Sequence, residues 1–78
     1  MSEIIITTTV DARGLSCPLP IVKTKKAMDT MQSGQVLELL STDKGSRKDV
    51  KAWADNGGHT LLDLQEEAGV FRFHIQKG

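Results

Sequence analysis

The sequence predicts a two-layer α/β (α+β) sandwich, in which two helices cover one face of a mixed four-stranded sheet. The runs "EIIITTTV" and "QVLELLST" are rich in β-branched and aliphatic residues, and each precedes a segment with helical periodicity. Strands joined by a right-handed helical connection are parallel. The C-terminal segment instead has two apolar runs around the short turn "EAG", which is typical of an antiparallel hairpin. The predicted order is therefore βαβαββ.

The first strand is predicted at residues 4–10, where the β-branched run ends before Asp11. The first helix is predicted from Pro18 to about Met31, and Gly34 follows as a left-handed terminating residue. Apolar side chains recur at helical spacing along this helix, so one face is expected to be buried. That face consists of Ile21, Thr24, Met28 and Met31.

The second strand is predicted at residues 36–41 and is apolar enough to lie in the centre of the sheet. The second helix is predicted to begin at Ser46 and to end at Gly57–Gly58. Ser46 and Asp49 have the Ser-x-x-Asp spacing of a capping box, so Asp49 is expected to be a helix cap. The buried stripe of this helix consists of Val50, Trp53 and Ala54.

The last two strands are predicted at residues 59–66 and from Val70 onward. The final strand alternates strictly between apolar and polar side chains. Phe71, Phe73 and Ile75 face one side, and Arg72, His74 and Gln76 face the other. The aromatic side chains of this strand and of the second helix are therefore expected in the core.

The composition limits the class of protein. The 78 residues are expected to form a single domain, 1–78. Lys+Arg and Asp+Glu are equal at 10 each and the aromatic content is 4%, so direct nucleic-acid binding is not favoured. No apolar run approaches the roughly 20 residues that span a bilayer, and "MSEIIITTTV" lacks the basic segment of a signal peptide. We expect a cytoplasmic monomer without membrane contact.

Cys17 is the only cysteine, so the chain can form neither an internal disulfide nor a structural zinc site by itself. His59 and His74 have no metal-ligand spacing to each other or to Cys17, so we expect surface histidines and no metal site. A lone cysteine is commonly a small buried apolar residue. Here it directly precedes Pro18 at a predicted helix start, which favours a chemical role.

Local chemistry at the helix start favours an activated thiol. If the proline at position 18 is the first helical residue, Cys17 is the N-cap. The two prolines of "CPLP" leave the amides of Leu19 and Ile21 as the hydrogen-bond donors near the sulfur. These donors and the helix dipole would stabilise a thiolate or persulfide and lower the thiol pKa below about 8.5. Arg13 is expected to assist this shift and Asp11 to oppose it.

The stretch "GLSCPLP" and the order βαβαββ resemble the TusA-like (SirA-like) family of sulfur-carrier proteins. The family's Cys-Pro-x-Pro motif at the start of the first helix is matched by Cys17, Pro18, Leu19 and Pro20. The preceding "DARGLS" matches the family pattern D-x-x-G-L-x-C-P-x-P, and we count Arg13 and Gly14 among the positioning residues. "STDKGSRKDVKAW" and "GGHTLL" resemble the family's second-helix entry and third-strand start, so the resemblance spans nearly the whole chain.

The resemblance implies a sulfurtransferase that acts as a persulfide relay rather than as a stand-alone catalyst. Cys17 would accept sulfane sulfur from a cysteine desulfurase or a rhodanese and pass it to an acceptor protein, and this exchange would need no metal and no cofactor. Family members serve tRNA thiolation, sulfur oxidation, and cofactor or selenium metabolism. Carriers for tRNA thiolation tend to have Glu at the variable motif position, so Leu19 favours sulfur oxidation or general sulfur trafficking. Some relatives carry a second cysteine where this chain has Ala54, so no two-thiol mechanism is implied.

Two groups of basic side chains could dock an acidic partner. Lys23, Lys25 and Lys26 follow the motif, and Lys44, Arg47, Lys48 and Lys51 surround the second helix. If both helices share one layer, Lys23, Lys26, Arg47 and Lys48 are expected to form a basic surface beside the thiol. Solvated helix faces are the alternative interpretation of these side chains. Turn chemistry alone can explain Asp43 and Gly45 after the second strand.

A second class of function stays open from the sequence. The chain could be a non-enzymatic regulatory or protein-interaction module, in which Cys17 is a redox-sensing or structural residue. Partner binding that survives Cys17→Ser, together with a slow thiol, would indicate this class. RNA binding is a third class, and strongly salt-dependent association would indicate it.

Overall fold

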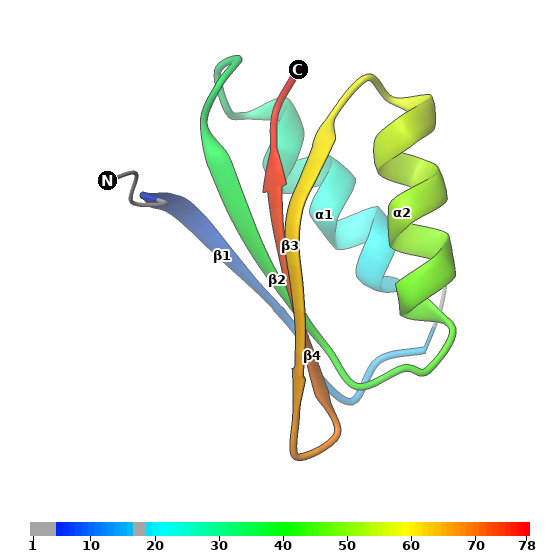
Figure 1. Cartoon of the computed structure of the whole chain (residues 1–78). Coiled ribbons are helices and arrows are strands. Elements are labelled where there is room, and N and C mark those ends of the chain that lie inside the picture. Colours follow the sequence, from blue (N-terminus) through cyan, green and yellow to red (C-terminus); the bar gives the residue numbers. More distant parts are fainter. Residues whose placement is uncertain (1–4, 17–18) are drawn as a thin grey trace.

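The computed structural model describes residues 5–16 and 19–78, and its elements have the predicted order βαβαββ. The elements are β1 (Ile6–Ala12), α1 (Leu19–Asp29), β2 (Val36–Ser41), α2 (Ser46–Asn56), β3 (Thr60–Glu67) and β4 (Val70–Gln76). The strands form one four-stranded sheet in the order β1-β2-β4-β3. Both helices pack on the same face of this sheet, α1 against β1 and β2, and α2 against β3 and β4 (Figure 1). The predicted two-layer sandwich is confirmed.

The pairing of the strands makes the sheet mixed, as predicted. β1 and β2 are parallel, with Val10 opposite Leu39. β4 lies between β2 and β3 and is antiparallel to both, so that Phe73 is opposite Leu39 on one side and Leu64 on the other. The apolar strand β2 is central, and β1 and β3 are the edges of the sheet.

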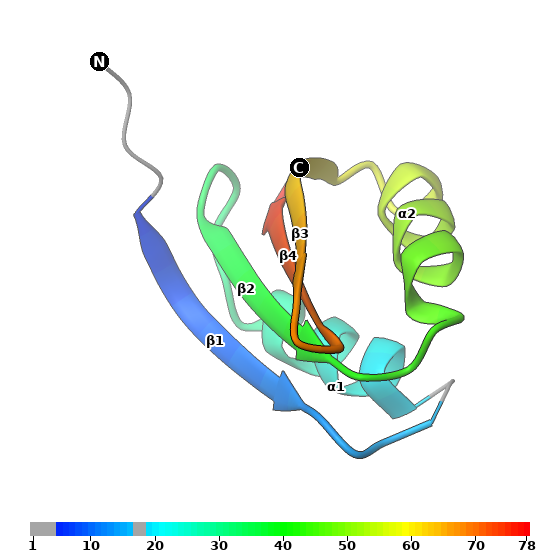
Figure 2. The same ribbon diagram turned by 60° about the horizontal axis from the view of Figure 1, so that its bottom comes forward.

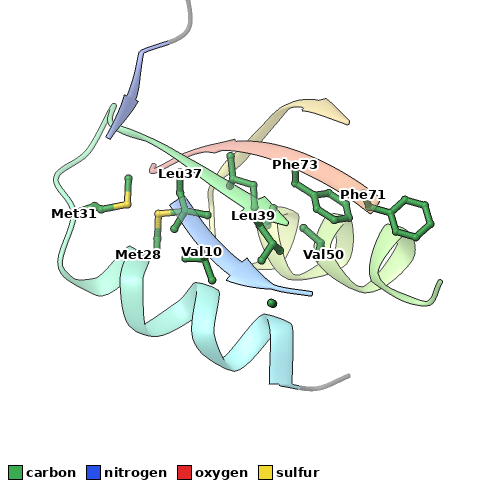
Figure 3. Close-up of a cluster of buried hydrophobic side chains, with 11 residues drawn as sticks. Val10, Met28, Met31, Leu37, Leu39, Val50, Phe71 and Phe73 are labelled. Atoms are coloured by element: carbon green, nitrogen blue, oxygen red, sulfur yellow. The ribbon is translucent and has the colours of Figure 1, made fainter. Parts of the chain in front are cut away.

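The core lies between the sheet and the two helices (Figure 3). Alternate residues of β4 face the helices because side chains along a strand point to opposite faces. Phe71, Phe73 and Ile75 are accordingly buried, at 4%, 0% and 0% exposed. The helices contribute residues at helical spacing to the same core: Pro20, Thr24 and Met28 from α1, and Val50 and Ala54 from α2. Trp53 is only partly buried and packs against the edge of the core.

Some predicted boundaries are displaced. β1 spans Ile6–Ala12 and is thus displaced by two residues from the predicted 4–10. It ends later because Asp11 and Ala12 pair with β2 and do not start the loop. α1 ends at Asp29, before the predicted Met31, and Thr30 caps its last turn by donating from Oγ1 to the Ala27 carbonyl at 2.7 Å. Gly34 has the expected positive φ, +91°, but it belongs to the following turn.

The predicted capping box of α2 is wrong. Gly45 is the N-cap, and it makes no side-chain capping hydrogen bond. Ser46 is the first helical residue, and its hydroxyl is buried in a 2.7 Å hydrogen bond with the Ser41 hydroxyl. A serine that satisfies a buried strand residue is not free to cap its helix, so Asp49 has no reciprocal partner in a box and lies exposed in the first turn.

The β3–β4 hairpin turns through Ala68 and Gly69, which both have positive φ, at 53° and 80°. Two such residues form a type I′ turn, which strongly favours Asn-Gly. Alanine in the left-handed region costs roughly 1 kcal/mol. We therefore expect Ala68→Asn to stabilise the fold by roughly 0.5–1 kcal/mol in urea unfolding. Ala68→Val should destabilise it, and a loss of stability in Ala68→Asn would contradict this assignment of the turn.

The sheet face opposite the helices carries a group of charged side chains. His74 Nε2 lies 3.0 Å from Glu38 Oε2, and Arg72 Nε lies 3.6 Å from the same oxygen. The His74 side chain is only 14% exposed, so it is more enclosed than the predicted surface histidine. His59 also has a ring contact, because its ring centroid lies 5.1 Å from that of Trp53, with the two planes tilted by 33°.

Candidate functional site

The loops that follow β1 and β2 meet at one end of the sheet, because the carboxyl ends of parallel strands share an edge. The Gly14 amide donates to Thr42 Oγ1 at 2.9 Å and so ties the first loop to the second. Gly14 has a φ of +81°, which explains why a glycine suits this turn. The loops lead into α1 and α2, whose N-terminal ends lie at the same end of the molecule (Figure 2). Thr42 was not singled out from the sequence, since nothing local marks a loop threonine as a partner.

Cys17 and Pro18, the first half of the motif, lie outside the described residues. The predicted N-cap position and lowered pKa of Cys17 therefore stay predictions. Of the two amides expected to donate to the sulfur, that of Leu19 donates to the Ser16 carbonyl at 3.0 Å instead. The first turn of α1 contains no acidic side chain, so the positive end of its dipole is not neutralised there.

The described half of the motif places two side chains in opposite environments. Pro20 is fully buried in the interior, and its carbonyl accepts a 2.8 Å hydrogen bond from the buried Thr24 hydroxyl. Leu19 is 51% exposed, and Val22, three residues further along the same helix face, is 41% exposed. Lys23 and Lys26 continue this face and are also exposed. We call Leu19, Val22, Lys23 and Lys26 the α1 stripe.

Arg13 forms a two-pronged ion pair with Asp11 at the end of β1. Its Nε and terminal nitrogen donate to the two carboxylate oxygens at 2.9 and 2.8 Å, and its backbone amide donates at 3.1 Å. These hydrogen bonds lower the pKa of Asp11 from 3.8 to about 2, and the carboxylate raises the pKa of Arg13. Each charge of this exposed pair is therefore balanced by the other, just before the motif.

The Asp11 pair gives an expected titration. Because the folded pKa of Asp11 is depressed, its stabilising effect is complete above the ordinary value of 3.8 and is lost as the pH falls through about 2. Carboxyl carbon chemical shifts should give a midpoint of about 2 for Asp11 in the wild type. In Arg13→Gln the midpoint should rise toward 3.8, the ordinary value. Equal midpoints in the two proteins would show that Arg13 does not hold this carboxylate.

The basic side chains separate into two regions. Lys23 reaches toward β1, where its Nζ lies 3.5 Å from the Asp11 carbonyl oxygen. Arg47 and Lys48 instead line a groove beside α2 and the opposite edge strand, together with Lys44 and Lys51. The structure thus brings the cations of α2 together and places Lys23 near the other edge of the sheet.

Among residues 5–16 and 19–78, no group of three or more His, Cys, Asp or Glu side chains is arranged to hold a metal ion. Within the same ranges, no helix has the length and apolarity required to cross a membrane.

A comparison with known protein families identifies the family of this chain. The family model of sulfurtransferase TusA matches residues 8–77, which include both helices, all of β2, β3 and β4, and most of β1. The chain belongs to the TusA family. The predicted resemblance to the TusA-like family is therefore confirmed over residues 8–77.

Individual TusA relatives agree with this assignment. YrkI of Bacillus subtilis is 54% identical over 88% of this chain and 92% of its own length. The sulfur carrier protein TusA of Allochromatium vinosum is 50% identical over 87% of this chain and 90% of its own length. The crystal structure of a SirA-like protein from Desulfitobacterium hafniense has a TM-score of 0.81 at 30% identity. The match between the two structures covers 92% of this chain and 99% of the SirA-like chain.

Proposed function

We propose that this TusA-family chain carries sulfane sulfur as a persulfide on Cys17 and relays it between a donor and an acceptor protein. The observation that carries this proposal is the contrast between the last two motif positions. Pro20 is fully buried beneath the start of α1, whereas Leu19 is 51% exposed two residues from the cysteine. A buried proline fixes the first turn, and an exposed leucine offers a contact for a partner.

The chemistry is thiol–persulfide exchange. The Cys17 thiolate attacks the terminal sulfur of the donor's persulfide, so that a new S–S bond forms and the donor's S–S bond breaks. The donor leaves as a thiolate, and there is no net oxidation. A thiolate of the acceptor then attacks the terminal sulfur on Cys17 in the same way. The step requires no metal and no organic cofactor.

The α1 stripe is proposed as the surface that docks the donor and the acceptor. Leu19 and Val22 supply exposed apolar contact, and Lys23 and Lys26 can pair with carboxylates on a partner. A cysteine desulfurase or a rhodanese is the expected class of donor. Leu19 in place of the glutamate common in tRNA-thiolation carriers favours sulfur oxidation or general sulfur trafficking as the pathway.

Mass spectrometry tests the proposal. After incubation with a cysteine desulfurase and cysteine, the tryptic peptide of residues 14–23 should gain the mass of one sulfur atom, and reductant should remove it. Cys17→Ala, digested in the same way, should gain none. Loading of Cys17→Ala, or no loading of the wild type by any sulfane donor, would refute the proposal and favour a redox-sensing or structural cysteine.

A further inference from the structure

The α2 groove is a basic surface distinct from the α1 stripe. It has a volume of about 600 Å³ and is lined by Lys44, Gly45, Arg47, Lys48, Lys51 and Leu64. The first five of these residues come from the loop before α2 and from its first half, and Leu64 comes from β3. We propose that this groove binds an acidic segment of a partner protein.

The charge of the groove lining favours an acidic ligand. Among the residues that the structure describes, four cationic side chains and no carboxylate line the groove. Within the described residues, Lys51 pairs with Asp55 at 3.1 Å, and this pair is exposed. In the part of the chain that the structure describes, no ion pair within 4 Å is made by Lys44, Arg47 or Lys48. Three cations are therefore left to neutralise a ligand.

Acidic side chains at the mouth of the groove limit where a ligand can bind. A Cβ at Gly45 would lie 3.4 Å from Asp43 Oδ2 and 3.7 Å from Asp49 Oδ2. These two carboxylates therefore lie at the N-terminal end of α2. An acidic segment should consequently lie closer to Lys48 and Leu64 than to these two carboxylates.

The residues that line the groove favour a peptide over a nucleic acid as its ligand. A single-stranded nucleic acid binds best where aromatic rings stack on its bases, and within residues 5–16 and 19–78 no aromatic residue lines this groove. The formal net charge of the chain is also +0, which gives no general attraction to a polyanion. Leu64 instead supplies an apolar contact among the cations. The fitting ligand is thus a segment with several carboxylates around an aliphatic side chain.

Fluorescence anisotropy with a labelled acidic peptide, "EDELDE", tests the inference, with the neutral peptide "QNQLNQ" as the reference. Binding of the acidic peptide should be measurable below about 1 mM and should weaken with salt. Lys44→Gln/Lys48→Gln should raise its Kd about tenfold. Lys25→Gln, which removes a cation from an exposed position of α1, should change the Kd less than about twofold.

The outcomes separate this inference from the persulfide proposal. Cys17→Ser should bind the peptide as the wild type does, because no groove residue is part of the motif. Equal binding by wild type and Lys44→Gln/Lys48→Gln, or no preference for the acidic peptide over the neutral one, would overturn the inference. A single-stranded RNA that binds through the same lysines while the peptide does not would overturn it in favour of nucleic acid.

Discussion

Phe73→Ala is expected to destabilise the fold by about 3–5 kcal/mol, because it removes the largest fully buried side chain of the core. Phe73 is 0% exposed and lies opposite both Leu39 and Leu64 in the sheet. The cavity left by its ring would lie within the buried core cluster. A domain of this size has a total stability of only about 4–12 kcal/mol, so the variant should be largely unfolded in mild urea.

Two further variants make this expectation testable even if Phe73→Ala does not fold. Phe73→Leu keeps most of the volume and should cost about 1–2 kcal/mol in urea unfolding. Leu62→Ala truncates an aliphatic side chain that is 41% exposed, and it should cost less than about 1 kcal/mol. Similar losses in Phe73→Leu and Leu62→Ala would contradict the central position given to Phe73.

Leu19→Glu is expected to slow sulfur loading from a protein donor by about thirtyfold, the effect of losing one central contact of an interface. The reason is that Leu19 is 51% exposed on α1, beside Val22 and close to the thiol in sequence. Loading from a small donor such as glutathione persulfide needs no docking surface, so its rate should be nearly unchanged. Single-turnover rates with the two kinds of donor measure the difference.

Leu62→Glu is the matched control for this experiment, because it places the same charge at another exposed aliphatic position, on β3. It should load at the wild-type rate from both donors. If Leu19→Glu loses the small-molecule reaction as well, the leucine acts on the thiol itself rather than on a partner. If it loses neither reaction, the α1 stripe is not the docking surface.

The fold could be predicted from the sequence because its strongest patterns coincide with burial. Strict alternation from Phe71 to Ile75 gave the correct face of β4, and the apolar run at residues 36–41 gave the central strand. The cap of α2 was mispredicted because Ser46 and Asp49 have capping spacing, while the partner of Ser46 is the buried hydroxyl of Ser41. A contact between a strand and the following helix cannot be deduced from local spacing.

The site could be predicted only in part. The motif and the family were recognised from "GLSCPLP", and the structure adds that Pro20 is buried while Leu19 is exposed. Arg13 is bound to Asp11 by hydrogen bonds at 2.8–3.1 Å, and its expected effect on the thiol stays a prediction. The separation of the basic side chains into two regions depends on which edge of the sheet each helix covers. The edge that each helix covers follows from the strand order, and helical periodicity alone does not predict the strand order.

The most direct test of the relay is to follow one sulfur atom into and out of the chain. The wild type is loaded by a cysteine desulfurase from radiolabelled cysteine, separated from the donor, and mixed with an acceptor protein that has a free thiol. A persulfide relay on Cys17 predicts about one labelled sulfur per chain after loading, transfer of that label to the acceptor, and neither step in Cys17→Ser. Equal labelling of the wild type and Cys17→Ser, or label that never leaves the loaded wild type, would contradict it.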